Sequence, residues 1–209
     1  MIVVGLTGSI GMGKSTAAGM LRRLGLPVHD ADDAVHRLLG KNGRAVKAVA
    51  AAFPQSLAED RIDRKVLGDL VFGNTQALRR LEGILHPLVS QAARAFLSSA
   101  ARRQTSIVVL DVPLLFETGG QRKFDAVIVV TAPAQVQRQR VLARRGMTEQ
   151  KFRSILARQV PDAVKRRHAT YVVRTGGHRG DTYRQLARIV RDIRLHRRKA
   201  RRHVARGYM

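Results

Sequence analysis

The chain contains no cysteine, few aromatic residues and few acids. Without cysteine, its 209 residues form neither disulfide bonds nor thiolate metal sites, and a cytoplasmic enzyme is the simplest interpretation. Only 4% of the residues are aromatic, so we do not expect a surface of interleaved aromatic side chains for stacking on bases. No apolar run approaches the ~20 residues of a transmembrane helix. The first apolar stretch is short, lacks a basic flank and leads into a glycine-rich motif, so we expect neither a signal peptide nor a membrane partner.

Basic residues far outnumber these few acids. The 39 Lys and Arg residues stand against 15 Asp and Glu residues, which gives a formal net charge of +24. Such a field attracts anions, including nucleotides, phosphorylated metabolites and, without specificity, nucleic acid. A solvated basic surface explains most of the arginines equally well. The hydrophobic fraction of 44% is enough for a sizeable core in one α/β domain with an insertion, or in one large and one small domain.

A glycine-rich motif organises the chain near its start. An apolar run over residues 2–4 leads into Gly8, Gly13, Lys14 and Ser15, which fit the P-loop pattern G-x-x-x-x-G-K-[ST]. Glycines let the backbone curl around a phosphate, and the helix that follows offers free N–H groups and the positive end of its dipole. Lys14 is expected to reach the β- and γ-phosphates, and the Ser15 hydroxyl to hold Mg²⁺. The motif therefore predicts a nucleoside triphosphate site.

Hydrophobic periodicity predicts an α/β fold around this motif. Short apolar runs that end in polar residues predict parallel strands near 2–7, 26–28, 106–111, 125–131 and 171–173. We expect a P-loop NTPase fold, with a five-stranded parallel sheet flanked by helices, a helical substrate-binding insertion and a small lid. The expected parts are a core (about 1–30, 104–136 and 168–195), a helical acceptor region (about 31–103), a lid (about 137–167) and a basic, frayed or disordered tail (about 196–209).

Two aspartates follow the second expected strand, at the sheet edge where ligands bind in open parallel sheets. Asp30 and Asp32 face the same way if the segment is extended, so both are candidates to reach an acceptor hydroxyl and Mg²⁺. The alternative is that Asp32 or Asp33 caps a helix that starts near Ala34.

Arginines in the expected lid suit phosphate binding. Arg140 and Arg144 lie four residues apart on an expected helix over 134–145 and would share one face, where two guanidinium groups can clamp a phosphate. A solvated basic face is the alternative.

Two further polar residues are candidates for substrate binding. His86, before Pro87, either contacts an acceptor phosphate or caps a helix that restarts after the proline. Glu117 either orders Mg²⁺-bound water or nearby backbone, or is an exposed loop acid.

Other P-loop classes fit less well. The chain has no N-K-x-D base-reading motif of a GTPase, and its central strand ends in Asp111-Val112-Pro113 rather than the Asp-Glu usual in motor and transporter ATPases. A small-molecule kinase needs an acceptor base, cations for the moving phosphoryl group and a lid that excludes water, and the chain has candidates for each.

Along nearly its whole length the chain resembles the bacterial dephospho-CoA kinase family. The resemblance rests on the order of several segments rather than on the P-loop alone. They are Gly5–Thr16, Asp30-Ala31-Asp32, Leu81–Leu88 with its His-Pro pair, Val112–Glu117, Gln137-x-x-Arg140-x-x-x-Arg144, and Gln159.

The resemblance implies ATP-dependent phosphorylation of the ribose 3′-hydroxyl of dephospho-CoA, the last step of coenzyme A synthesis. It implies a P-loop core, a helical CoA-binding region and a lid. By position, Asp32 matches the family's proposed base, the loop Gly11-Met12-Gly13-Lys14-Ser15-Thr16 matches its ATP site, and Arg140 and Arg144 match its lid arginines.

The chain departs from the family pattern after the lid, where Ala169–Thr175 replaces a usual Ala-Asp-x-Val-Ile-x-Asn. The resemblance therefore does not carry the family's contacts of this segment, near the adenine, over to this chain. Two other functions stay open at this point: a different small-molecule or nucleotide kinase, and an ATPase stimulated by nucleic acid. We expect no specific nucleic-acid partner, and the sequence does not indicate an oligomeric state.

Overall fold

The computed structural model describes residues 1–206, with side chains described through residue 195. The chain divides into two compact units. The sheet unit comprises Met1–Val28 and the described residues from Gln104 on, and the helical unit comprises His29–Arg103.

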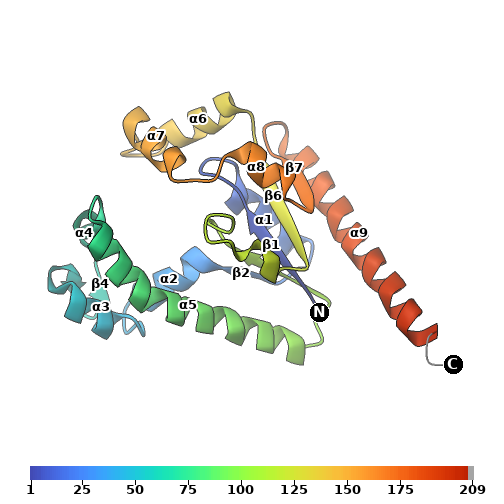
Figure 1. Cartoon of the computed structure of the whole chain (residues 1–209), viewed down its shortest axis with the longest axis horizontal. Helices are drawn as coiled ribbons and strands as arrows, with labels where there is room; N and C mark the ends of the chain where they lie inside the picture. Colours follow the sequence, from blue (N-terminus) through green and yellow to red (C-terminus); the bar gives the residue numbers. More distant parts are fainter. Residues whose placement is uncertain (207–209) are drawn as a thin grey trace. The chain divides into compact units, whose positions relative to one another are not determined.

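A five-stranded sheet in the order β2-β5-β1-β6-β7 confirms the expected fold class (Figure 1). Neighbouring strands pair in parallel, with Leu6 opposite Asp111 and Ile128, and Ile128 opposite Tyr171. The strands are β1 (Ile2–Thr7), β2 (Val28–Asp30), β5 (Ile107–Asp111), β6 (Ala126–Thr131) and β7 (Tyr171–Arg174).

Both faces of this sheet are covered, which is why its strands are apolar runs rather than alternating patterns. Along β6, Ile128 and Val130 pack into a cluster with helices α1 and α9, whereas Val127 and Val129 pack with Leu115 on the other side. The helices of this unit are α1 (Lys14–Arg23), the 3₁₀ turn η2 (Gly120–Lys123), α6 (Ala134–Leu142), α7 (Glu149–Ala157), α8 (Asp162–Arg167) and α9 (Arg179–Arg206). Gly25, at φ 79°, follows α1 as expected for a helix end, and the Thr148 side chain caps α7.

The helical unit has its own core. Helix α5 packs against α2, α3 and α4 around Leu39, Val49, Leu67 and Leu81 (Figure 1). The elements are α2 (Ala31–Leu39), α3 (Val46–Ala52), the 3₁₀ turn η1 (Pro54–Ser56), the two-stranded β3 (Leu57–Ala58) and β4 (Arg61–Ile62), α4 (Arg64–Val71) and α5 (Thr75–Arg102). Asp63 caps α4, because its carboxylate accepts the N–H groups of Lys65 and Val66.

Two expected helix boundaries are wrong. His86-Pro87 does not interrupt the helix: α5 runs from Thr75 to Arg102 with Pro87 inside it. Pro87 removes a single N–H bond, to the carbonyl of Gly83, while Leu81 and Leu85 before it and Leu88 and Val89 after it all pack into the same core. Tertiary packing on both sides of the proline therefore outweighs the local break.

The C-terminal boundary is also wrong, since α9 continues to Arg206 through the segment expected to be frayed or disordered. Residues 207–209 of the expected tail lie outside the described residues. No helix among residues 1–206 is both long and apolar enough to cross a membrane.

Candidate active site

The glycine-rich loop joins β1 to α1 in the sheet unit. Gly11 and Gly13 have φ values of 76° and 83°, in the left-handed region that side chains disfavour. Gly13 is the N-cap of α1 and has no side chain to cap it, so the first N–H groups of the helix, from Lys14 on, remain for an anion. A Cβ atom on Gly8 would lie 2.8 Å from the carbonyl oxygen of Val130, which explains the first glycine of the motif.

Lys14 is held at this loop by a buried carboxylate. Its Nζ lies 2.5 Å from Oδ1 of Asp111, the last residue of β5, and the two side chains are 14% and 0% exposed. Asp111 lies opposite Leu6 on the neighbouring strand β1, so the carboxylate is placed where β1 turns into the loop. The pair fixes the ammonium group beside the expected position of the phosphates.

The same corner suits Mg²⁺ that is shared with phosphates. The hydroxyl groups of Ser15 and Thr16 are exposed on the first turn of α1, and the Asp111 carboxylate supplies a hard oxygen ligand. Among the side chains that the structure describes, residues 1–195, no cluster of three or more His, Asp or Glu is arranged to hold a metal ion. This donor set therefore fits an ion that completes its coordination with substrate oxygens and water, rather than an all-protein site.

Arg140, on α6, reaches back to the loop. Its Nη1 and Nη2 atoms donate to the Oγ1 and carbonyl oxygen of Thr175, at 3.2 and 2.6 Å. The Thr175 hydroxyl in turn donates to the carbonyl of Met12 at 2.7 Å. A Cβ atom on Gly13 would lie 3.5 Å from Arg140 Nη1, so the guanidinium group lies against the loop.

Arg144 does not share a helix face with Arg140, and that expectation is wrong. Helix α6 ends at Leu142, and Arg144 lies exposed in the following turn. Gly146, at φ 75°, turns the chain toward α7 instead of extending α6.

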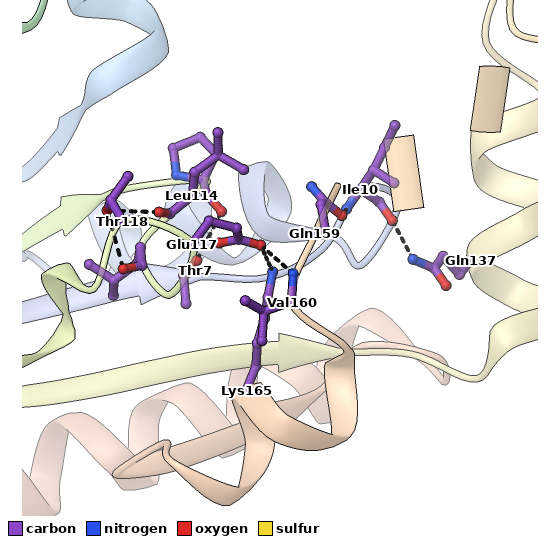
Figure 2. A network of polar contacts seen from close by, with 11 residues as sticks. Thr7, Ile10, Leu114, Glu117, Thr118, Gln137, Gln159, Val160 and Lys165 are labelled. Atoms are coloured by element: carbon purple, nitrogen blue, oxygen red, sulfur yellow. Dashed lines mark hydrogen bonds and ion pairs between the residues drawn. The ribbon is translucent and has the colours of Figure 1, made fainter. Parts of the chain in front are cut away.

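Two glutamines hold the backbone of Ile10, a residue of the loop (Figure 2). Gln159 Oε1 accepts the Ile10 N–H at 3.1 Å, and Gln137 Nε2 donates to the Ile10 carbonyl at 2.7 Å. Ile10 thus has both of its backbone polar groups fixed from the segment 137–159, which ties this part of the expected lid to the loop.

Glu117 belongs to the same network (Figure 2). Its Oε1 accepts the Val160 N–H at 3.0 Å and lies 2.8 Å from Nζ of Lys165, which is fully buried. Of the alternatives for Glu117, these contacts correspond to the ordering of nearby backbone.

A cavity of about 530 Å³ lies beside the loop, at the carboxyl ends of β6 and β7. Its walls combine small and apolar residues with two guanidinium groups. They include Met12, Pro133, Asp162, Arg166, Arg174 and Gly176. Asp162 is fixed at this cavity, since its Oδ2 accepts the Thr131 hydroxyl at 2.8 Å and pairs with Arg166.

The acceptor candidates Asp30 and Asp32 lie in the helical unit. They do not form an extended pair, because α2 begins at Ala31. Asp30 is the N-cap, and its Oδ1 accepts the N–H groups of Asp32 and Asp33 at 2.9 and 3.2 Å. The expected alternative of capping by Asp32 or Asp33 is therefore wrong. Asp32 is exposed in the first turn of α2, and its carboxylate is left for another partner.

His86 is exposed in the middle of α5. Because α5 is continuous, His86 does not cap a new helix. Burial and then the Arg37 charge lower the pKa of His29 below its ordinary value, against a smaller effect of Asp30 that raises it.

The family model and the curated relatives indicate one family. The family model for dephospho-CoA kinase matches residues 2–180. A dephospho-CoA kinase of Mesorhizobium japonicum is 58% identical over 176 residues, which cover 84% of this chain and 88% of that protein. The chain belongs to the dephospho-CoA kinase family. The crystal structure of TT1252 from Thermus thermophilus matches with a TM-score of 0.77 and 32% identity over 90% of this chain and 95% of that one. The dephospho-CoA kinase of Campylobacter jejuni shares the fold, with a TM-score of 0.68 and 24% identity over 91% and 96% of the two chains.

In this dephospho-CoA kinase family member, the glycine loop, Lys14 and Arg140 come together within the sheet unit, whereas Asp30, Asp32 and His86 belong to the helical unit. Asp111 was missed by reasoning from the sequence. The signal was present: an apolar strand that ends in an acid beside the P-loop strand. In the sequence, this acid, which no Glu follows, was used only to separate the chain from motor and transporter ATPases. Gln137 and Gln159 matched the family, but no local pattern indicates that both bind the backbone of Ile10.

Proposed function

We propose that the chain transfers the γ-phosphoryl group of ATP to the ribose 3′-hydroxyl of dephospho-CoA. The acceptor oxygen forms a bond to the γ-phosphorus, the bond from that phosphorus to ADP breaks, and the hydroxyl proton leaves, which gives coenzyme A and ADP. The observation that carries the proposal is the assembly of loop, Lys14 and Arg140 in a chain of this family.

The donor half of the site is the loop with Gly8 and the residues Gly11, Met12, Gly13, Lys14, Ser15 and Thr16. Backbone N–H groups at the start of α1 bind the phosphates, and Lys14 exchanges Asp111 for the β- and γ-phosphate oxygens. Arg140 neutralises charge on the transferring group, and Arg144 binds ATP from the turn after α6.

Mg²⁺ fits at the same corner. Ser15 and Asp111 are the ligands we propose, with Asp32 as a further candidate, and the ion would neutralise charge on the phosphates when it is bound. The chain's own contribution is the placement of these oxygen atoms at the end of β5 and the start of α1.

The cavity beside Met12 is our candidate for the nucleotide base. A flat ring fits between apolar walls and a guanidinium face such as that of Arg166 or Arg174. Arg174 and Gly176 lie next to Thr175, the end of the segment in which the family pattern is lost.

On the acceptor side, Asp32 accepts the proton of the 3′-hydroxyl as general base. Asp30 supports it by fixing the first turn of α2, since its carboxylate binds the Asp32 N–H. His86 is a proposed acceptor contact, and Glu117 acts by holding Val160 and Lys165. We place this biosynthetic kinase in the cytoplasm.

A coupled assay of ADP release with dephospho-CoA and MgATP tests the function. We expect wild-type turnover and a loss of about 100-fold or more in kcat for Asp32→Asn, with the KM for ATP little changed. Asp33→Asn is the matched control, because Asp33 is the next exposed acid of the same turn and has no proposed role. Near-normal turnover in Asp32→Asn removes Asp32 from the base role, and phosphorylation of a nucleoside monophosphate but not of dephospho-CoA overturns the function.

A further inference from the structure

The helical unit contains a second cavity, of about 450 Å³. It lies at the end of α2, beside β4 and the start of α4, wholly within residues 36–65. Four of its nine lining residues are Lys or Arg: the lining is His36, Leu39, Gly40, Lys41, Arg61, Ile62, Asp63, Arg64 and Lys65.

The charge of this basic cavity is strongly positive. Lys41, Arg61, Arg64 and Lys65 bring four cations, against the single carboxylate of Asp63. That carboxylate is already used, since its Oδ1 accepts the N–H groups of Lys65 and Val66 at 2.8 and 3.1 Å. These two bonds also hold the Asp63 pKa below its ordinary value. The cavity therefore offers hydrogen-bond donors in excess, which suits an anion with several oxygen atoms.

Arg64 is oriented before any ligand binds. Its Nη1 lies 2.8 Å from Nδ1 of His36, on the neighbouring helix α2. A guanidinium group has only donors, so Nδ1 is the acceptor and His36 is the neutral tautomer with its proton on Nε2. The contact restrains an exposed arginine at the cavity, and the His36 ring adds a donor rather than a competing acceptor.

The position of this cavity relative to Asp32 matches the acceptor molecule. Asp32 and His36 lie four residues apart on α2, so they are neighbours on one face with Cβ atoms about 5–6 Å apart. Dephospho-CoA carries its 3′-hydroxyl and its 5′-diphosphate on the same ribose ring. A ribose placed with its 3′-hydroxyl at Asp32 can therefore direct the diphosphate along α2 toward His36 and Arg64.

We propose that the basic cavity binds the diphosphate of the acceptor, with Arg64 as its principal ligand and Lys41, Arg61 and Lys65 completing the charge. This assignment rests on the proposed function, since it takes the acceptor to be a nucleoside diphosphate ester. In this assignment the helical unit holds the diphosphate, the only charged group of the acceptor, and thereby orients the 3′-hydroxyl at Asp32.

Initial rates with varied dephospho-CoA at saturating MgATP test the assignment. Arg64→Gln removes a charged donor to phosphate, and we expect its KM for dephospho-CoA to rise about 10-fold to 100-fold while kcat changes less than about twofold. Lys41→Gln removes a charge without disturbing the Arg64–His36 bond and should raise the same KM by a smaller factor. Arg79→Gln is the matched control: Arg79 is exposed on α5, outside the cavity, and its loss changes the net charge equally.

Inorganic pyrophosphate at saturating MgATP distinguishes a free anion from the diphosphate of the acceptor. Inhibition that is competitive with dephospho-CoA, and that weakens about tenfold in Arg64→Gln, supports the assignment. Inhibition that depends on Arg64 but is not competitive makes the cavity a separate anion site and overturns it. Equal KM values for dephospho-CoA in Arg64→Gln and Arg79→Gln would show that the cationic residues of the cavity are only a solvated basic surface, and this result also overturns the assignment. In that case the activity of the wild-type chain toward dephospho-CoA still supports the proposed function. A wild-type chain that does not phosphorylate dephospho-CoA refutes the proposed function itself, and this assignment with it.

Discussion

The buried ion pair between Lys165 and Glu117 gives the sharpest test of how the sheet unit is held together. The Lys165 side chain is 0% exposed and the Glu117 side chain 12% exposed, with Nζ and Oε1 2.8 Å apart. Oε1 also accepts the Val160 N–H, so one carboxylate joins the loop after β5 to the start of α8 (Figure 2). Either charge alone in this position would be largely cut off from water.

The cost of breaking the pair follows from that burial. Lys165→Met keeps the length of the side chain but leaves Glu117 without its cation, which should lower the free energy of unfolding by about 3–5 kcal/mol. Glu117→Gln leaves the buried Lys165 without its carboxylate and should lower the free energy of unfolding by a similar amount. The double variant leaves no buried charge, and the amide oxygen that replaces the Glu117 carboxylate can still accept the Val160 N–H. We therefore expect the double variant to lie within about 2 kcal/mol of wild type.

Urea unfolding of the four chains, followed by circular dichroism, measures these free energies. The coupled buried pair would be refuted if the double variant lost the sum of the two single losses in the free energy of unfolding. A loss below about 1 kcal/mol in Lys165→Met would refute it as well. The stable double variant also separates two roles of Glu117. A KM for dephospho-CoA within about threefold of wild type fits a residue that acts through Val160 and Lys165, whereas a KM raised about tenfold or more would indicate direct substrate contact.

The parts of the fold that depend on neighbouring residues in the sequence were predictable. The loop was recognisable because its chemistry needs glycine at fixed positions, and Gly11 and Gly13 do adopt left-handed φ values. The buried strands β5 and β6 were recognisable as continuous apolar runs, since both faces of the sheet are covered. Caps such as Asp63 and Thr148 are local features of the same kind, because a cap acts within three residues of itself.

The errors arose where distant packing decides the outcome. Pro87 looked like a helix end because the local cost is visible in the sequence, whereas the compensating contacts of α5 with α2, α3 and α4 are not. Helix α2 starts earlier than expected, and this moved Asp32 from a strand end to a helix turn.

The polar framework of the site was hidden for the same reason. Glu117 and Lys165 are 48 positions apart, and Gln159 is 149 positions from Ile10, so no periodicity connects them. Asp111 is different, because its place at the end of an apolar strand was visible. What the sequence did not contain was the pairing of β5 with β1, which brings that carboxylate to Lys14. Sheet order, more than secondary structure, thus determines which acid becomes part of the site.

Two further predictions concern the loop and the far edge of the sheet. Gly11→Ala places a Cβ atom 2.9 Å from the Gln137 carbonyl oxygen, at a backbone φ of 76°, so the KM for ATP should rise about tenfold or more. Gly19→Ala is the control, because its Cβ atom would meet nothing within 4 Å. Equal KM values for ATP in the two variants would contradict the reasoning. At β7, the Tyr171 hydroxyl donates to Asp192 at 2.5 Å, and burial, then this bond and the Asp192 charge, raise the Tyr171 pKa from 10.0 to about 12. The unfolded chain ionises this phenol first, so its contribution to stability is complete below pH 10 and is lost between pH 10 and about 12. Urea midpoints of wild type and Tyr171→Phe should therefore converge across that range, and a constant difference would show that Tyr171 is not linked to Asp192 in this way.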